Sequence, residues 1–373
     1  MLTRTRRAGA ILLVVAIATG AAACGSDDES GADATLALTD VAADTSTPSE
    51  APDGTTASTE SGEEGQGDAA AFPVTLEHKF GETVIESAPE RVVVVGLTEQ
   101  DALLALGVTP VGVTDWFGGH EYAVWPWAQD LLGDARPEVL NIDDGIQIER
   151  VAALDPDVII GLYSGITDLE YEQLSQIAPT VAQPGEYVDW GIPWQEQTLA
   201  VGKIVGKADE AAALVADVEA QFATTREAHP EFDGASGIMA TPYEGIYVYG
   251  PEDVRGRFMS DLGFIMPDEL AALAGDEFGF EVSLEQYELL NTDVLVWLDV
   301  EDAGAAFGGG VYESMTVHQE GREVFLDSES EDSLGGATSF VTVLSLPFLL
   351  EGIVPMFAAA IDGDPATAVP ASS

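Results

Sequence analysis

Two arginines are the most conspicuous candidates for a binding role in this sequence. Arg255 and Arg257 are the only Lys or Arg between Arg226 and Arg322, in a chain with 13 Lys and Arg, 66 Asp and Glu and a net charge of −53. A guanidinium group donates paired hydrogen bonds to anionic oxygens. We therefore expect Arg255 to contact an anionic ligand, with Arg257, inside a predicted helix, as the second candidate. The alternative is a salt bridge to one of the many carboxylates.

Aromatic residues form a second group of candidates. Five of the six Trp lie between residues 116 and 194, and several aromatic side chains directly follow predicted strands. Such rings bury large areas and stack, which suits a large, flat, partly apolar ligand. Core packing is the alternative for each, and we favour it for Trp125 and Trp127, which lie in a predicted Pro-kinked helical segment. The candidate ligand contacts at strand ends are Trp116, Phe117, Tyr163, Trp190, Tyr243 and Trp297.

The spacing of reactive residues argues against an enzyme. The four His are scattered along the chain without metal-ligand spacing. Residues 161–165 follow a predicted strand, but their Ser164 stands one position too late for the nucleophile elbow Gly-x-Ser-x-Gly. There is no Gly-rich phosphate loop of standard form. We predict no catalytic residue, no metal site and no cofactor.

The charge excludes whole classes of partner. From Cys24 onward, 66 Asp and Glu stand against 10 Lys and Arg. Such a chain is repelled by nucleic acid and by anionic lipid, so we exclude a nucleic-acid partner. A surface this acidic also suggests a salt-rich habitat, where screening weakens the self-repulsion.

Residues 1–23 have the pattern of a secretory signal peptide. Three Arg precede an uncharged run over residues 8–23, which is shorter than the roughly 20 residues of a membrane-spanning helix. The small residues before Cys24 resemble the lipobox of bacterial lipoproteins, although Ala21 stands where that pattern usually has Leu. Cys24 is the only cysteine. We expect it to carry a lipid anchor on the outer face of the cell membrane; the alternative is ordinary signal-peptidase cleavage after an Ala.

Residues 24–71 are predicted to be a disordered tether. This stretch is built mainly from Asp, Glu, Ser, Thr, Gly and Ala and has no aromatic or basic residue. It has too little apolar surface to offset the chain entropy of folding, and its like charges favour an extended chain.

From residue 72 the pattern predicts an α/β fold. β-Branched runs bounded by Gly or Pro alternate with helical patterns, which favours a mainly parallel sheet. The predicted strands are residues 92–95, 111–114, 158–160, 238–240, 246–249, 294–298 and 324–326. The first predicted helix begins at residue 98 and is closed by Gly107. The other predicted helices are residues 148–154, 169–178, 194–205, 208–229, 257–262, 284–290 and 344–360.

A short internal sequence repeat suggests two similar lobes. Residues 148–160 and 284–296 both place a Glu in the first turn of a short helix and an Asp-Val pair at the start of a strand. The longest predicted helix lies between the two copies. We therefore expect two Rossmann-like lobes, residues 72–205 and 231–362, joined by a single long helix over 206–230 and followed by a polar tail, 363–373.

The order and spacing of several motifs between Thr75 and Ala360 resemble the helix-linked, class III substrate-binding proteins of ABC importers for ferric siderophores and cobalamin. The motifs that carry the resemblance are residues 75–81, 89–93, 101–113, 154–159 and 248–257.

This resemblance implies a monomeric, lipid-anchored protein that captures a ferric siderophore in a cleft between its lobes and delivers it to an ABC permease. Arg255 would then face an anionic siderophore, as basic residues of that family often do. Glu149 and Glu285 match the glutamates with which each lobe of the cobalamin-binding relatives pairs with permease arginines. A helix-dipole role for each Glu is the alternative.

Other functions stay open at this point. Cobalamin or haem could replace the siderophore. Direct capture of Fe³⁺ could use His120, Glu121 and the tyrosines Tyr243, Tyr247 and Tyr249, which supply hard ligands. A wall-associated scaffold would need no enclosed cleft.

Overall fold

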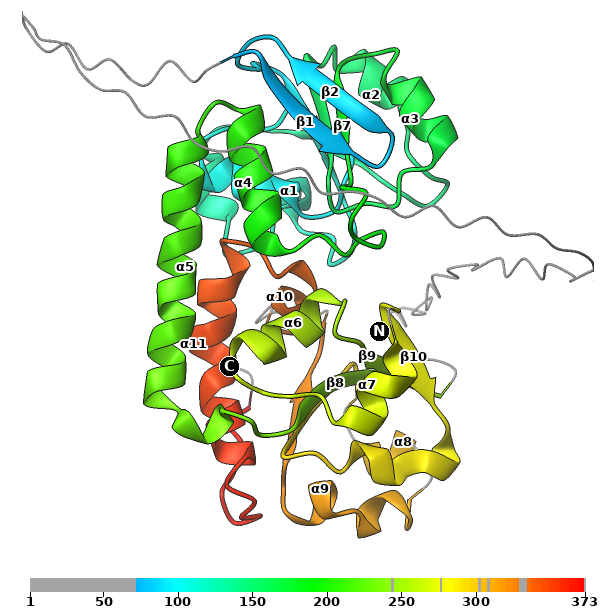
Figure 1. Cartoon of the computed structure of the whole chain (residues 1–373), viewed down its shortest axis with the longest axis vertical. Coiled ribbons are helices and arrows are strands. Elements are labelled where there is room, and N and C mark those ends of the chain that lie inside the picture. The colour runs from blue at the N-terminus through cyan, green and yellow to red at the C-terminus, as the bar shows by residue number, and fades with distance from the viewer. Residues whose placement is uncertain are drawn as a thin grey trace, which may run out of the picture. The chain divides into compact units, whose positions relative to one another are not determined.

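The computed structural model describes residues 72–242, 245–275, 277–300, 303–306, 309–328 and 334–371. Within these ranges no helix is long and apolar enough to cross a membrane. The described chain forms two five-stranded sheets, each with its own helices, and a separate two-stranded hairpin (Figure 1). The expected α/β class with two lobes is therefore confirmed.

The sheet of the N-terminal lobe is parallel throughout, in the order β5-β4-β3-β6-β7. Its central strands are buried along their whole length, which explains their continuous β-branched sequences. The hairpin β1–β2 adjoins β7, where Thr83 Oγ1 donates to the carbonyl of Thr180 at 2.7 Å. The strands of this lobe are β1 (Val74–His78), β2 (Gly81–Ile85), β3 (Val92–Val94), β4 (Gly112–Thr114), β5 (Glu138–Leu140), β6 (Val158–Gly161) and β7 (Thr180–Ala182).

Helices connect these parallel strands. A capping box begins α3, because Thr167 Oγ1 accepts from the Glu170 N–H while the Glu170 carboxylate accepts from the Thr167 N–H at 2.9 Å. The segment with Trp125 and Trp127, expected to be a Pro-kinked helix, is not helical, and residues 126–128 form a turn between two 3₁₀ segments. The elements are α1 (Glu99–Ala105), η1 (Glu121–Ala123), η2 (Gln129–Leu132), α2 (Ile148–Ala153) and α3 (Asp168–Leu174).

The sheet of the C-terminal lobe is mixed, in the order β10-β9-β8-β11-β12. Its strands β8, β11 and β12 are parallel, whereas β9 is antiparallel to both of its neighbours. The strands are β8 (Gly237–Pro242), β9 (Ile246–Tyr249), β10 (Gly279–Val282), β11 (Val294–Leu298) and β12 (Glu323–Leu326). The helical segments are η3 (Pro230–Phe232), α6 (Val254–Asp261), α7 (Asp268–Ala274), η4 (Leu284–Leu290), α8 (Ala303–Ala306), η5 (Tyr312–Ser314), α9 (Thr316–Gln319), α10 (Leu334–Phe340) and α11 (Ser345–Ala360).

Long helices join the lobes. The helix α4 (Trp194–Ile204) packs on α5 (Ala208–Ala228), and α5 runs beside α11 (Figure 1). Gly202 permits the close approach of α4 and α5, because a Cβ there would overlap the Ala211 side chain. One apolar core runs through α1, α4, α5, α6 and α11 and so continues from one lobe into the other. This continuous core restricts movement between the lobes.

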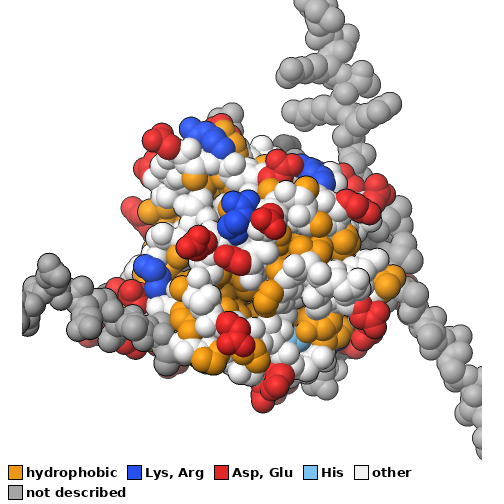
Figure 2. Space-filling view, turned by 90° about the horizontal axis from the view of Figure 1, so that it is seen from above, with side chains coloured by type: hydrophobic (Ala, Val, Ile, Leu, Met, Phe, Trp, Pro, Cys, Tyr) orange, Lys and Arg blue, Asp and Glu red, His pale blue; other side chains and the backbone are white. Residues whose placement is uncertain are grey.

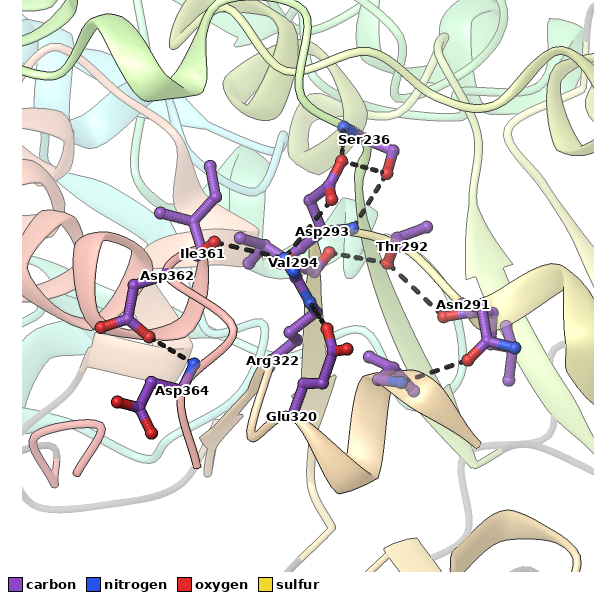
Figure 3. A network of polar contacts seen from close by, with 12 residues as sticks. Ser236, Asn291, Thr292, Asp293, Val294, Glu320, Arg322, Ile361, Asp362 and Asp364 are labelled. Carbon is purple, nitrogen blue, oxygen red and sulfur yellow. Dashed lines mark hydrogen bonds and ion pairs between the residues drawn. The ribbon is translucent and has the colours of Figure 1, made fainter. Parts of the chain in front are cut away.

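The surface is acidic with few basic groups. On the face shown in Figure 2, acidic side chains are scattered singly, and the basic side chains lie close to acidic ones. At the amino ends of the C-terminal strands, Arg322 donates to Glu320 at 2.7 Å and to Asp293 and the Ile361 carbonyl (Figure 3). This network ties the end of α11 to the sheet.

Candidate functional site

Three predicted contacts emerge at one edge of the N-terminal sheet. Because all five strands of this sheet are parallel, their carboxyl ends lie together, and ligands of open α/β sheets bind beyond that edge. Trp116 and Phe117 follow β4 by two and three residues, and Tyr163 follows β6 by two. The topology therefore brings these three side chains together.

An aromatic cluster forms at this edge with a contribution from the other lobe. The ring centroid of Trp116 lies 4.9 Å from that of Phe117, 6.2 Å from that of Tyr163 and 5.7 Å from that of Phe340. Phe340 ends α10 of the C-terminal lobe and also lies 5.8 Å from Phe117. We call Trp116, Phe117, Tyr163 and Phe340 the inter-lobe aromatic cluster. Trp116 and Phe117 are half-buried, whereas Tyr163 and Phe340 are buried.

Trp125 and Trp127 support this cluster from behind. Their rings stack with centroids 5.0 Å apart, and Trp125 lies 5.1 Å from Phe117 and 5.2 Å from Phe340. Trp125 is buried and Trp127 partly so, which agrees with the packing role that the sequence favoured. Gly336 of α10 is required here, because a Cβ would overlap the Trp125 ring.

Trp190 lies on the loop between β7 and α4, which contacts the C-terminal lobe through a hydrogen bond from Arg257 to the Gly191 carbonyl. Its φ of 61° is in the left-handed region, and its ring packs over Gly165, where a Cβ would stand 2.6 Å from the ring. The Trp190 N–H donates to the Ser164 carbonyl at 3.2 Å. Lys79 anchors the same loop through an ion pair of 2.7 Å with Asp189. These contacts hold the partly exposed indole beside the strand-end residues.

The buried carboxylate of Glu99 organises two strand-end loops. Its Oε1 accepts from the Tyr163 N–H at 2.7 Å and its Oε2 from the Thr98 N–H at 3.1 Å. Gly96 makes room for this carboxylate, because a Cβ there would overlap it. Burial raises the pKa of Glu99 to about 7, although the backbone N–H groups oppose this shift. Glu99 was not predicted as a site residue, since an acid in a first helical turn is common.

Asp101 is a second buried carboxylate, and it also went unnoticed. Its Oδ2 accepts from Trp127 Nε1 at 2.8 Å and from Thr342 Oγ1 at 2.5 Å, so it connects the lobes. Its Oδ1 has no hydrogen-bond partner among the described residues. Burial raises the pKa of Asp101 to about 6, against the lowering effect of its two donors. No local signal in one sequence identifies a partner 241 positions away.

Arg255 is buried and paired. The helix α6 begins earlier than expected, because Asp253 caps it by accepting from the Arg255 N–H at 2.7 Å. Arg255 Nη1 also donates to both Asp253 oxygens at 3.1 and 3.0 Å, and Nη2 donates to Ser339 Oγ at 2.6 Å. Its guanidinium lies 4.1 Å from the centroid of the Tyr249 ring. The salt bridge considered as the alternative is therefore present.

Arg257 spans the two lobes. Its Nη1 donates to the Gly191 carbonyl, and its Nη2 pairs with Glu252 at 2.7 Å. Its guanidinium lies 5.7 Å from the ring centroid of Tyr187, which belongs to the Trp190 loop. Arg257 also lines a hollow of about 190 Å³ between α4 and α6.

Trp297 does not lie at the site. It is fully buried in a core of the C-terminal lobe, and its Nε1 donates to Tyr312 Oη at 2.7 Å and to Glu323 at 3.1 Å. The expectation of a ligand contact was wrong because Trp297 lies within β11 and not beyond its carboxyl end, and every residue of that strand is buried. Tyr243 and Cys24 lie outside the described residues.

The two candidate docking glutamates are exposed. Glu149 lies in the first turn of α2 and Glu285 in the first turn of η4, a 3₁₀ segment rather than the expected α-helix. Neither carboxylate makes a hydrogen bond or an ion pair within the described part of the chain. Each segment precedes a parallel strand, β6 or β11, as the sequence repeat predicted.

Two further observations bear on ligand chemistry. In the part of the chain that the structure describes, no three His, Cys, Asp or Glu are grouped closely enough to hold a metal ion. A groove of about 910 Å³ also runs between α5 and α11, lined by Trp127, Phe348 and mostly small or apolar neighbours. Of the aromatic residues discussed above, only Trp127 reaches this groove.

Comparison with known proteins identifies the family. The model of the periplasmic binding protein family matches residues 92–315, more than half of the chain. The chain belongs to the periplasmic binding protein family. This membership confirms the resemblance found in the sequence and places the chain among binding proteins rather than enzymes.

Curated relatives of this periplasmic binding protein are named for iron complexes. The ferric-anguibactin-binding protein FatB of Vibrio anguillarum is 31% identical over 237 residues, which cover 61% of this chain and 69% of the relative. The probable siderophore-binding lipoprotein YfiY of Bacillus subtilis is 29% identical over 232 residues, 60% of this chain and 68% of the relative.

Solved structures agree with the fold. A periplasmic solute binding protein from Mycobacterium smegmatis superposes with a TM-score of 0.68 at 36% identity and covers 77% of this chain and 98% of that structure. PiaA of Streptococcus pneumoniae in complex with ferrichrome gives a TM-score of 0.68 at 25% identity and covers 78% of this chain and 99% of that structure.

Proposed function

We propose that this periplasmic binding protein captures a ferric siderophore between its lobes and presents it to an ABC permease for iron uptake. The relatives FatB and YfiY, named as a ferric-anguibactin-binding protein and a probable siderophore-binding lipoprotein, support this assignment. So does the similarity to a ferrichrome-bound structure. The siderophore is cargo and not a cofactor, and the protein works as a monomer.

The inter-lobe aromatic cluster is the observation that carries the proposal. Both lobes supply rings to it, and the half-buried faces of Trp116 and Phe117 suit a large, partly apolar chelate. A ligand on these rings would touch the carboxyl edge of the sheet and α10 together. The proposed contacts are Trp116, Phe117, Tyr163, Trp190, Tyr243, Arg255 and Arg257.

Quenching of tryptophan fluorescence tests the proposal. The full-length protein is titrated with ferric hydroxamate, catecholate and citrate complexes, with cobalamin, with haem and with Fe³⁺ held by a weak chelator. We expect saturable quenching by a ferric chelate, reduced in Trp116→Leu because the ring in contact is lost. Quenching by cobalamin or haem alone, or by Fe³⁺ from the weak chelator alone, would overturn the siderophore assignment. If none of these ligands quenches the fluorescence, the result would support a scaffold function instead.

Docking to the permease is proposed to use Glu149 and Glu285. Both carboxylates are exposed, and they occupy equivalent positions before β6 and β11. Replacing both by Arg should abolish uptake of the chelate into cells and leave its affinity in solution unchanged. Glu172 in α3 and Glu269 in α7 are exposed controls for the same charge reversal. Equal loss of uptake in the control would contradict a specific docking role.

The protein is proposed to be held at the outer face of the cell membrane by a lipid on Cys24. A cysteine is required for this modification, so Cys24→Ser should release the protein from the membrane fraction into the medium. Mass spectrometry of the mature amino terminus reports the lipid directly. An unmodified amino terminus in the wild-type protein would refute the anchor.

A further inference from the structure

Every Lys and Arg after residue 72 lies in the part of the chain that the structure describes. Ten Lys and Arg follow residue 72, and the positions outside the described ranges after that point contain none. Most of the ten lie away from the inter-lobe aromatic cluster, before the amino ends of strands or on the linking helices. These are Arg91, Arg150, Lys203, Lys207, Arg226 and Arg322. Arg136 also precedes a strand, but its guanidinium lies 5.1 Å from the ring centroid of Tyr122, on the loop after β4, and it donates to the carbonyls of Gly133 and Ala135.

The remaining three cations approach the site, and each has an acidic partner. Lys79 pairs with Asp189, Arg255 with Asp253 and Arg257 with Glu252. The sequence suggested free guanidinium groups for an anionic ligand. The structure offers ion pairs with no net charge.

The Arg255–Asp253 pair is the firmest of the three. The Asp253 side chain is fully buried and that of Arg255 is 8% exposed. An anionic ligand that drew Arg255 away would leave a buried carboxylate without its counter-ion, which is strongly unfavourable. Arg255 also holds Ser339, next to Phe340 of the aromatic cluster. Its bonds therefore position α10 against the site.

The Arg257–Glu252 pair is more accessible, but it supplies little positive charge to a ligand. Glu252 is 42% exposed and Arg257 is 21% exposed, so water screens their attraction. An approaching anion could recruit Arg257 at a modest cost. One such cation compensates a single negative charge at most.

Further carboxylates lie at the same edge, and none of them supplies positive charge to a ligand. Glu99 and Asp101 lie behind Tyr163 and Trp127, and Asp115 directly precedes Trp116. None of these three makes an ion pair with Lys or Arg in the described structure. Burial raises the pKa of the Asp115 carboxyl, His120 opposes this shift, and Asp143 adds a smaller raising effect. Because the pKa of Glu99 is raised to about 7, this carboxyl is partly protonated at neutral pH, but the site as a whole still offers no net positive charge.

We infer that the cargo is a ferric chelate of neutral or positive charge, of the trihydroxamate class, rather than a polyanionic catecholate or citrate complex. Three hydroxamate groups, each with one negative charge, neutralise Fe³⁺ and leave an uncharged core with apolar edges. Three catecholate groups, each with two negative charges, leave their ferric complex with a net charge of about −3. This inference rests on the proposed function and names the ligand class of the same site.

Isothermal titration of the full-length protein tests the inference. The probes are the ferric complexes of ferrioxamine B, ferrichrome, enterobactin and citrate, measured at low salt. We expect the two hydroxamates to bind at least about tenfold more tightly than the two anions, a difference of about 1.4 kcal/mol. Tighter binding of enterobactin or citrate would overturn the inference but leave the proposed function intact. Binding of no ferric complex would overturn both.

One variant tests the role of charge pairing. Glu252→Gln frees Arg257 at an exposed position. It should improve the affinity for ferric enterobactin several-fold and leave ferrichrome within about twofold, because only the anion gains an uncompensated cation. Glu269→Gln removes the same charge from an exposed site without an ion pair and should change neither affinity. Equal changes for both chelates in Glu252→Gln would count against the inference.

Discussion

Thr342 Oγ1 donates a hydrogen bond of 2.5 Å to Asp101 Oδ2 across 241 positions of the chain. The donor precedes α11 of the C-terminal lobe, and the acceptor lies in α1 of the N-terminal lobe. Both side chains are buried. The bond therefore fixes the relation of the lobes directly beside the aromatic cluster, where a ligand would have to fit.

Thr342→Val tests the importance of this contact for stability. The variant keeps the shape of the side chain but leaves the buried Asp101 carboxylate with Trp127 as its remaining donor. We expect the free energy of unfolding to fall by about 1–3 kcal/mol. Urea denaturation measures this loss. Thr338→Val is the matched control, since Thr338 is equally buried but bonds only to the nearby Gly335 carbonyl; a loss as large in the control would contradict a special role for the inter-lobe bond.

Glu99 predicts a pH dependence of stability. Its pKa is raised from 4.5 to about 7 in the folded protein, so between these values the folded chain holds a proton that the unfolded chain has released. The free energy of unfolding should therefore fall as the pH rises from about 4.5 to 7, by about 3 kcal/mol from this group. Asp101, with its pKa raised to about 6, adds a change of the same sign.

Urea denaturation of the wild type and of Glu99→Gln at pH 5 and pH 8 isolates the contribution of Glu99. The variant has no carboxyl at this position, so it should lose less stability than the wild type between the two pH values. Parallel pH profiles for the two proteins would mean that Glu99 ionises normally in the fold.

Trp297 and Trp116 make a matched pair of substitutions. Trp297→Phe should destabilise the protein by about 2 kcal/mol, because it leaves a cavity in the core and removes a donor to Glu323. Its affinity for the ferric chelate should stay unchanged. Trp116→Phe should have the opposite profile, with weaker binding and nearly normal thermal stability. Weakened binding of the chelate by a stable Trp297→Phe protein would indicate that Trp297 contacts the ligand after all.

The acidic composition predicts stabilisation by salt. With 66 Asp and Glu against 13 Lys and Arg in the whole sequence, the chain repels itself at low ionic strength. The melting temperature should rise from about 0.1 M to about 2 M KCl, most steeply below about 1 M, where the Debye length shortens to about 3 Å. Differential scanning calorimetry measures this. A melting temperature that stays constant or falls over this range would speak against an adaptation to high salt.

Much of the site could be predicted from local patterns, and the rest could not. Trp116 and Tyr163 were identifiable because β-branched runs mark the strands, and parallel strands bring their carboxyl ends to one edge. Phe340 and Thr342 were missed, since they come from a distant part of the chain and reach the site only through the packing of α10 and α11. Trp297 misled the prediction, because the sequence does not show whether a residue near a strand end faces the site or, as here, a buried core.

The sequence by itself determined the α/β class, the long helix α5 and the scarcity of positive charge, because periodicity, composition and motif order are local or additive properties. The tertiary structure alone decided what the few cations do. Pairing depends on distances and burial, and these brought Arg255 to Asp253 and Ser339 and left Asp101 facing Thr342. The same residue that suggests an anionic ligand in sequence thus becomes one half of a neutral buried pair in the fold.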